Sequence, residues 1–212
     1  MAEISPIRQL TIASKGIINL RNPLLFVDNV IPFFASSITS LTIQCLAHVP
    51  VEIISSCVHL TSLAVSFTSL TGQSTIQSPG IPTKSKPLHH LQLTNFSYQN
   101  SRIALEVLLR PSSHVDLSRL QTLIVYADKS SYNIIKDLLK ACSNALEEFA
   151  LLSVGDSAWV QGNWENLNLQ EMSRLRTFRF HPPFANGPAR VVTRDPGSDK
   201  PWGAVTDYIP RS

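Results

Sequence analysis

Histidines and paired carboxylates are the residues of this chain whose types could support catalysis or metal binding. The six histidines are His48, His59, His89, His90, His114 and His181. None belongs to an HExxH motif, and the neighbours His89 and His90 would point to opposite faces of a strand. Joint metal ligation by that pair is therefore not expected, and structural or surface roles are favoured.

Nucleophile and phosphate motifs give the same result. The sequence has no Gly-x-Ser-x-Gly elbow and no Gly-x-x-x-x-Gly-Lys loop. The neighbours Glu147 and Glu148 flank the start of a predicted strand, where a solvated pair is favoured over acid–base catalysis. The sequence therefore predicts no catalytic residue, no metal site and no cofactor, and the chain is not expected to be an enzyme.

Three cysteines, Cys45, Cys57 and Cys142, occur without a CxxC pair. An odd number with this spacing argues against a disulfide framework and against a zinc site. The N-terminus lacks the basic and apolar segments of a signal peptide, and no apolar stretch reaches the length of a membrane span. These features predict reduced, buried thiols in a cytoplasmic or nuclear protein that does not enter a membrane.

The overall composition is that of a folded chain with little charge. Of 212 residues, 43% are apolar and 16% are charged, and the formal net charge is +3. This length allows one domain with a sizeable core, and the apolar content excludes a largely disordered chain. Because the basic residues are scattered, nucleic acid is not an expected partner.

The elements that must position any site are indicated by a recurring pattern: apolar, two residues, apolar, one residue, apolar. It occurs at Ile7-Leu10-Ile12, Ile38-Leu41-Ile43, Leu60-Leu63-Val65, Leu88-Leu91-Leu93, Leu120-Leu123-Val125, Leu146-Phe149-Leu151 and Leu175-Phe178-Phe180. The last two residues of each triplet alternate, as a short strand with one buried face requires. Each triplet therefore predicts a turn followed by a strand.

Segments with helical periodicity lie between the triplets. In residues 131–142, the apolar side chains fall on one helix face, and Ser130 or Ser131 can cap the N-terminus. Further helical segments are expected within residues 23–34, 51–57 and 101–110. Residues 66–87 and 153–166 are rich in turn-forming residues and predict loops.

One short strand and one helical segment in every roughly 20–29 residues is typical of a leucine-rich repeat. The predicted fold is α/β: a leucine-rich-repeat-like solenoid of about seven units over residues 1–181. Its short strands would form a curved parallel sheet, with helices and loops on the convex side. Residues 182–212 predict a poorly ordered C-terminal tail, in which Trp202 and Tyr208 could fold back on the last unit. An ordinary α/β sheet with helical crossovers is the alternative.

The residues around two cysteines carry a more specific resemblance. The run from Cys57 through Leu60 and Leu63 to Val65 reads C-x-x-L-x-x-L-x-[LV], and the run from Cys142 to Leu151 repeats it with one extra residue. It resembles the cysteine-containing leucine-rich repeat of F-box proteins, and the Ser/Thr-rich texture resembles the fungal members with degenerate repeats. The resemblance covers about residues 5–182. It implies that each cysteine ends a helix and packs at the turn into the next strand.

One part of the family pattern is missing. Residues 1–37 hold no Leu-Pro-x-Glu run, with which an F-box would begin. The resemblance therefore implies substrate recognition of the kind found in F-box ubiquitin-ligase receptors, whereas binding to the ligase adaptor is not supported by these residues.

Solvent-facing positions of the predicted strands give the candidate site. We expect partner-binding residues on the concave face at Gln92, Ile124, Tyr126, Leu152 and Arg179, because aromatic, aliphatic and arginine side chains dominate protein interfaces. The expected function is a scaffold for protein–protein interaction. Two alternatives stay open: a small α/β enzyme whose site has no recognisable motif, and a truncated, non-functional paralogue.

Overall fold

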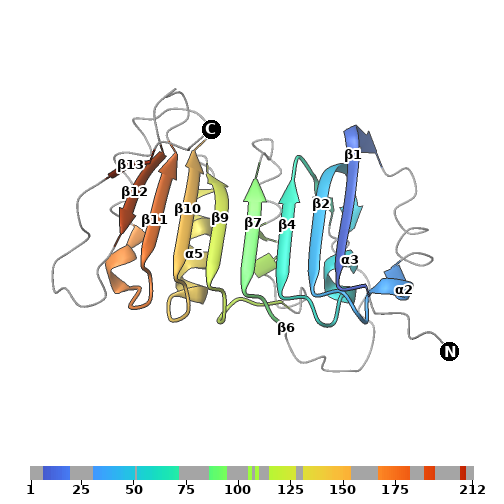
Figure 1. The fold of residues 1–212 in the computed structure, drawn as a ribbon, viewed down its shortest axis with the longest axis horizontal. Coiled ribbons are helices and arrows are strands. Elements are labelled where there is room, and N and C mark those ends of the chain that lie inside the picture. The colour runs from blue at the N-terminus through green and yellow to red at the C-terminus, as the bar shows by residue number, and fades with distance from the viewer. Residues whose placement is uncertain are drawn as a thin grey trace.

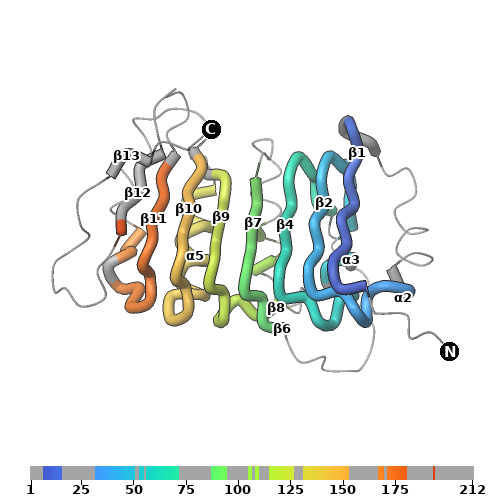
Figure 2. Tube along the Cα trace, in the orientation of Figure 1, coloured from blue at the N-terminus to red at the C-terminus, as the bar shows by residue number. Residues whose placement is uncertain are grey.

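The computed structural model describes about three fifths of the chain, drawn in colour in Figure 1; Figure 2 traces the chain in the same orientation. The described residues are 7–19, 31–50, 52–71, 86–94, 105–106, 108–109, 115–127, 131–153, 167–181, 189–193 and 206–208.

A large sheet carries the fold. Its seven parallel strands are β1 (Gln9–Asn19), β2 (Ser40–Ala47), β4 (Ser62–Ser66), β7 (His90–Thr94), β9 (Thr122–Ala127), β10 (Glu148–Ser153) and β11 (Thr177–His181). They lie side by side in the order of the chain (Figure 1). Each of the seven triplets contributes its last two residues to one of these strands. The prediction of a mixed α/β fold with a parallel sheet is therefore confirmed.

The register aligns the triplets across the sheet. The central residues form one continuous row: Leu10, Leu41, Leu63, Leu91, Leu123, Phe149 and Phe178. From Leu41 onward these side chains are buried, and the next row, from Ile43 to Leu151, is buried beside them. Successive residues of a strand point to opposite faces, so both rows face the same side and form one core.

Helical segments cover this apolar face. They are α2 (Ile31–Phe34), α3 (Glu52–Ser56), α5 (Tyr132–Cys142) and the 3₁₀ turn η3 (Leu169–Glu171). Figure 1 shows α3 and α5 behind the sheet, on the same side of it. Helix α5 buries Ile135, Leu138, Leu139 and Cys142 and leaves Ile134 partly buried, close to the predicted inward face.

The helix predictions are met to different extents. The α3 helix falls within the predicted segment 51–57, and of the segment 101–110 residues 105–106 and 108–109 are helical. Ser131 is the N-cap residue of α5, one of the two predicted positions, although its side chain makes no capping hydrogen bond. Ser130 and residues 23–30 lie outside the described ranges.

The turns into the strands repeat one hydrogen-bonding pattern. A single carbonyl oxygen at the start of one strand accepts two consecutive backbone N–H groups at the start of the next, at 2.8–3.1 Å. The accepting residues are Arg8, Thr39, Thr61, His89, Gln121 and Glu147. The same backbone geometry therefore recurs at all six steps between the seven parallel strands.

A shorter feature also recurs toward the ends of two strands, within β2 and directly after β4. Cys45 and Phe67 directly follow the paired residues Gln44 and Ser66, and both have a left-handed backbone, with φ of 57° and 49°. Each turn leads to a two-residue strand, β3 (Val49–Pro50) or β5 (Leu70–Thr71), which pair in parallel. A similar pair joins β6 (Lys86–Pro87) and β8 (Val115–Asp116).

Part of the predicted tail belongs to the sheet. Strand β12 (Ala189–Thr193) pairs antiparallel with β11, and β13 (Thr206–Tyr208) pairs antiparallel with β12. For these residues the structure differs from the expected tail: β12 pairs with the last predicted strand, whereas Tyr208 pairs with Ala189 of β12. Trp202 and the rest of 182–212 lie outside the described ranges.

Candidate functional site

The strand register brings the five predicted site residues onto neighbouring strands. Gln92 of β7 pairs with Ile124 of β9, which pairs with Ala150 of β10, which in turn pairs with Arg179 of β11. Tyr126 and Leu152 pair in a second row, two residues further along β9 and β10. Adjacent strands lie about 4.8 Å apart, so these side chains form one contiguous surface.

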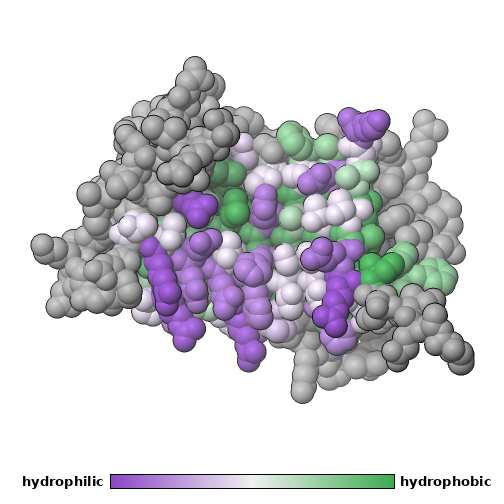
Figure 3. Space-filling model, viewed as in Figure 1, coloured by the Kyte–Doolittle hydropathy of each residue, from purple (hydrophilic) through white to green (hydrophobic). Residues whose placement is uncertain are grey.

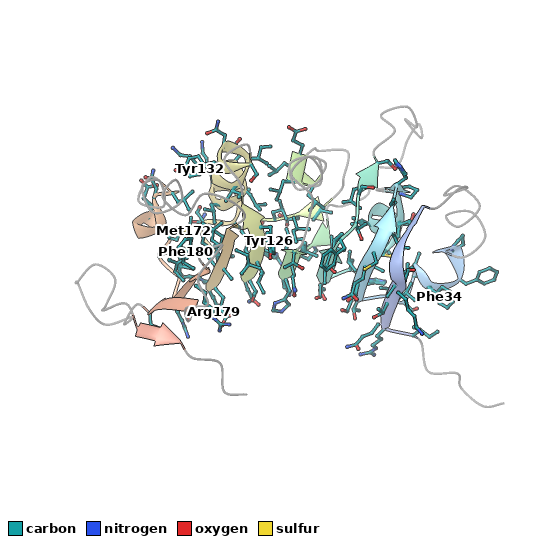
Figure 4. The ribbon with its side chains drawn as sticks, turned by 90° about the horizontal axis from the view of Figure 1, so that it is seen from above. Phe34, Tyr126, Tyr132, Met172, Arg179 and Phe180 are labelled. Carbon is teal, nitrogen blue, oxygen red and sulfur yellow. The ribbon has the colours of Figure 1, made fainter. Side chains whose placement is uncertain are left out.

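This surface is the face of the sheet that the helices leave open. In Figure 4, Arg179 lies on the side of the sheet opposite to Tyr132, Met172 and Phe180, which lie on the helix side. Gln92 and Arg179 are exposed, whereas Ile124, Tyr126 and Leu152 are partly buried. We call Gln92, Ile124, Tyr126, Ala150, Leu152 and Arg179 the open-face cluster.

Ala150 is the member of this cluster that sequence reasoning did not select. Its side chain is the smallest of the open-face cluster, and only 9% of the residue is exposed although it faces away from the helices. The larger residues Ile124 and Arg179 are its partners on either side. The sequence signal for its orientation is its position between the apolar residues Phe149 and Leu151, which are both buried on the other face.

Electrostatics around the cluster are simple. In β7, β9, β10 and β11 the only Asp, Glu, Lys or Arg residues are Glu148 and Arg179. Arg179 Nη2 lies 3.8 Å from Glu148 Oε1, and the two side chains are 50% and 49% exposed. A surface pair at this distance contributes little to stability, about 0–1 kcal/mol, because both groups remain hydrated. The middle of the open face is otherwise uncharged.

Charged and polar side chains gather instead along the edge where the strands begin. Figure 3 shows hydrophilic side chains along this edge and weakly polar or apolar ones over the middle of the sheet. Exposed Arg119 and Gln121 precede β9, and exposed Arg174 and Arg176 precede β11. The partly buried Glu147 lies between them, since its carbonyl oxygen accepts the N–H of Arg176.

The residues first considered for chemistry are dispersed in the described structure. His48 and His59 are exposed at turns. At the start of β7, His89 is partly buried and His90 is exposed. His114 and the side chain of His181 lie outside what is described. Within the described residues, no group of three or more His, Cys, Asp or Glu side chains could hold a metal ion.

Two cysteines occupy equivalent buried positions at helix ends. Cys57 Sγ donates to the Ile53 carbonyl at 3.3 Å, and Cys142 Sγ donates to the Leu138 carbonyl at 3.2 Å. Each cysteine's carbonyl oxygen then accepts the N–H of the leucine that opens the next triplet, Leu60 or Leu146. Burial raises the pKa of the Cys142 thiol to about 12. Such a thiol is inert at neutral pH.

Thiol labelling tests this burial directly. We expect Cys45, which is partly exposed, to react with a water-soluble disulfide reagent in the native protein. Cys57 and Cys142 should react only after denaturation, because a buried protonated thiol is neither accessible nor nucleophilic. Mass spectrometry of the labelled peptides would identify the modified residues. Rapid native labelling of Cys142 would contradict its placement in the core.

Two further findings concern membrane-spanning helices and similarity to known proteins. In the described part, no helix combines the length and apolar character that crossing a lipid bilayer requires. Compared with family models, with curated proteins and with solved structures, the chain matches none of them.

Proposed function

We propose that this chain is a leucine-rich-repeat-type solenoid that recognises another protein through the open-face cluster. The observation that carries the proposal is the grouping of partly exposed Ile124, Tyr126 and Leu152 with Arg179 on three adjacent strands. Tyrosine and arginine are enriched among the residues that dominate binding energy, and aliphatic neighbours exclude water around them.

Support for the repeat architecture comes from backbone geometry that recurs with the triplets. The same two-donor hydrogen bonding occurs at six successive steps, as a stack of similar units requires. The sheet also turns toward its helix-free side at both ends, so that the open face lies on the inside of the bend (Figure 4). These features favour a solenoid over a sheet with unrelated crossovers.

Support for the cysteine-containing repeat comes from four equivalent turns. The carbonyl oxygens of Cys57, Leu117, Cys142 and Met172 each accept the N–H of the leucine that opens the following triplet, at 3.0–3.2 Å. All four residues are buried. Leu117 and Met172 thus take the place of the cysteine in two of the units. Apolar side chains of similar size can replace one another at a buried position of a degenerate repeat.

The proposed role follows from this type of fold. Substrate recognition of the kind found in F-box ubiquitin-ligase receptors needs only a presented face, and the open-face cluster offers one. Docking to the ligase adaptor is not part of the proposal, because no residues of an F-box are recognised in the sequence.

Photo-crosslinking from two tyrosine positions tests the proposal. Tyr126 lies on the open face, whereas Tyr132 lies on α5 on the helix side (Figure 4). With benzoylphenylalanine at position 126, we expect defined protein cross-links in an extract of the source cells. The same probe at position 132 should give none of these products. Mass spectrometry of the cross-linked species would make the comparison.

A second set of variants links the cross-links to the cluster. Adding Ile124→Ser and Leu152→Ser to the position-126 probe should reduce cross-linking at least tenfold, since each removes partly buried apolar surface. Phe33→Ala with Val58→Ala removes exposed apolar side chains elsewhere and should change nothing. Equal products from positions 126 and 132 would contradict recognition through this face.

A further inference from the structure

Ala150 lies at the centre of the open-face cluster and has its shortest side chain; we call this position the low point of the cluster. Ile124 and Arg179 lie on either side of Ala150 in its row. Glu148 and Leu152 lie two residues before and after it on the same strand and therefore on the same face. A short side chain among four longer ones leaves room for an apolar side chain from outside, bounded by Ile124 and Leu152.

Arg179 lies beside this low point, and within the described part of the chain its ion-pair partner is Glu148. Its guanidinium carries five N–H donors in a planar fork, and its ion pair with Glu148, at 3.8 Å, exceeds the length of a hydrogen bond. Both side chains are about half exposed, so the pair can separate at little cost. A carboxylate that approaches the fork squarely would form two charge-assisted hydrogen bonds, which are stronger than the existing contact.

We propose that the cluster binds an extended protein segment in which an apolar side chain and a carboxylate lie close together. The apolar side chain packs on Ala150 between Ile124 and Leu152. The carboxylate binds Arg179 and displaces Glu148, and Tyr126 covers the apolar contact from the second row. This inference rests on the proposed function and adds the chemical class of the partner segment.

The uncharged middle of the face supports this choice of partner. Arg179 is the only Lys or Arg in β7, β9, β10 and β11, so on these four strands it defines the one position at which negative charge is favoured. A long acidic tract would leave most of its carboxylates without a basic partner on these strands. One carboxylate beside one apolar group matches the charge and the polarity of the cluster.

A library of random peptides displayed on phage, selected against the full chain, tests the inference. We expect the recovered peptides to share an apolar residue and an Asp or Glu at a fixed spacing. Fluorescence anisotropy with the synthetic peptides would then give affinities. Replacing the shared acid by its amide, or Arg179→Gln in the protein, should weaken binding about tenfold, as the loss of a charge-assisted pair predicts.

Substitutions at Glu148 and Ala150 should change peptide binding in ways that a purely structural role of these residues would not predict. Glu148→Gln should strengthen binding about threefold, because it removes the internal carboxylate that competes for Arg179. Ala150→Leu should weaken binding about tenfold by filling the low point. Its matched control is Ala64→Leu, the same change in the same row on β4, which should leave binding unchanged. Circular dichroism would verify that each variant is folded.

The outcomes separate this inference from the function on which it rests. The recovered peptides could lack a shared acid, bind Arg179→Gln as well as the parent protein and fail to bind Ile124→Ser. That result would overturn the carboxylate partner but would still support recognition through the open face. Peptides unaffected by any open-face variant, or the failure of selection to enrich any peptide, would overturn both.

Discussion

Replacing Phe149 by alanine is expected to reduce the free energy of unfolding by about 3–5 kcal/mol. The residue is 1% exposed and is the central residue of its triplet. Its ring stacks on that of Phe178 in the neighbouring strand, with centroids 5.4 Å apart and planes at 24°. The loss combines the transfer of apolar surface, a cavity between two strands and a broken aromatic contact. Guanidinium unfolding followed by circular dichroism would measure it.

Phe33→Ala is the control for this substitution. Phe33 is 79% exposed, so the same chemical change should alter stability by less than about 0.5 kcal/mol. Phe149→Leu should fall between the two, because it keeps most of the buried volume. If Phe149→Ala cost no more than Phe33→Ala, the row of central triplet residues would not be a packed core.

The strands of the parallel sheet could be predicted from the sequence because their pattern follows from local geometry. A strand that buries one face needs apolar residues at every second position. The pairs Leu123–Val125 and Phe149–Leu151 meet this requirement within their own short segments. Strand β12 contains no triplet, and it pairs antiparallel with β11. Its existence depends on an available edge of the sheet, which is a tertiary property that no local pattern encodes.

Position in the stack explains another departure. Ile7 occupies the first position of its triplet but is 47% exposed, whereas its equivalents from Ile38 to Leu175 are buried. The sequence pattern is the same in all seven, but β1 is the first strand of the sheet and has one strand neighbour. Periodicity predicts which face a residue lies on, and the number of neighbouring units decides how deeply it is buried.

The candidate site divides in the same way between local and long-range information. Alternation alone placed Ile124, Tyr126 and Leu152 on the face opposite the core. The low point at Ala150 and the contact between Arg179 and Glu148 depend on the register between β10 and β11. A shift of one residue in that register would place Arg179 on the other face. The role of Arg179 could therefore be assessed only once the strand pairing was known.

Raising the pH is expected to destabilise the protein through the Cys142 thiol. This thiol is fully buried, and burial raises its pKa from an ordinary value of 9.0 to about 12. Above pH 9 the unfolded chain therefore releases a proton that the folded chain retains, so stability falls as pH rises between these values. The slope is about 1.4 kcal/mol per pH unit, and the total approaches ~4 kcal/mol for this single group.

The contribution of Cys142 can be separated from that of other groups that titrate in alkali. In Cys142→Ala, the free energy of unfolding should fall less steeply between pH 9 and pH 11 than in the parent protein, by about 1.4 kcal/mol per unit. Cys45→Ala should keep the parent's steep fall, because it leaves the buried Cys142 thiol in place. Parallel curves for the parent protein and Cys142→Ala would mean that the thiol reaches water in the folded state. The helix end that precedes the Leu146 turn would then be open, and the equivalence of the Cys57 and Cys142 turns, on which the repeat proposal draws, would be lost.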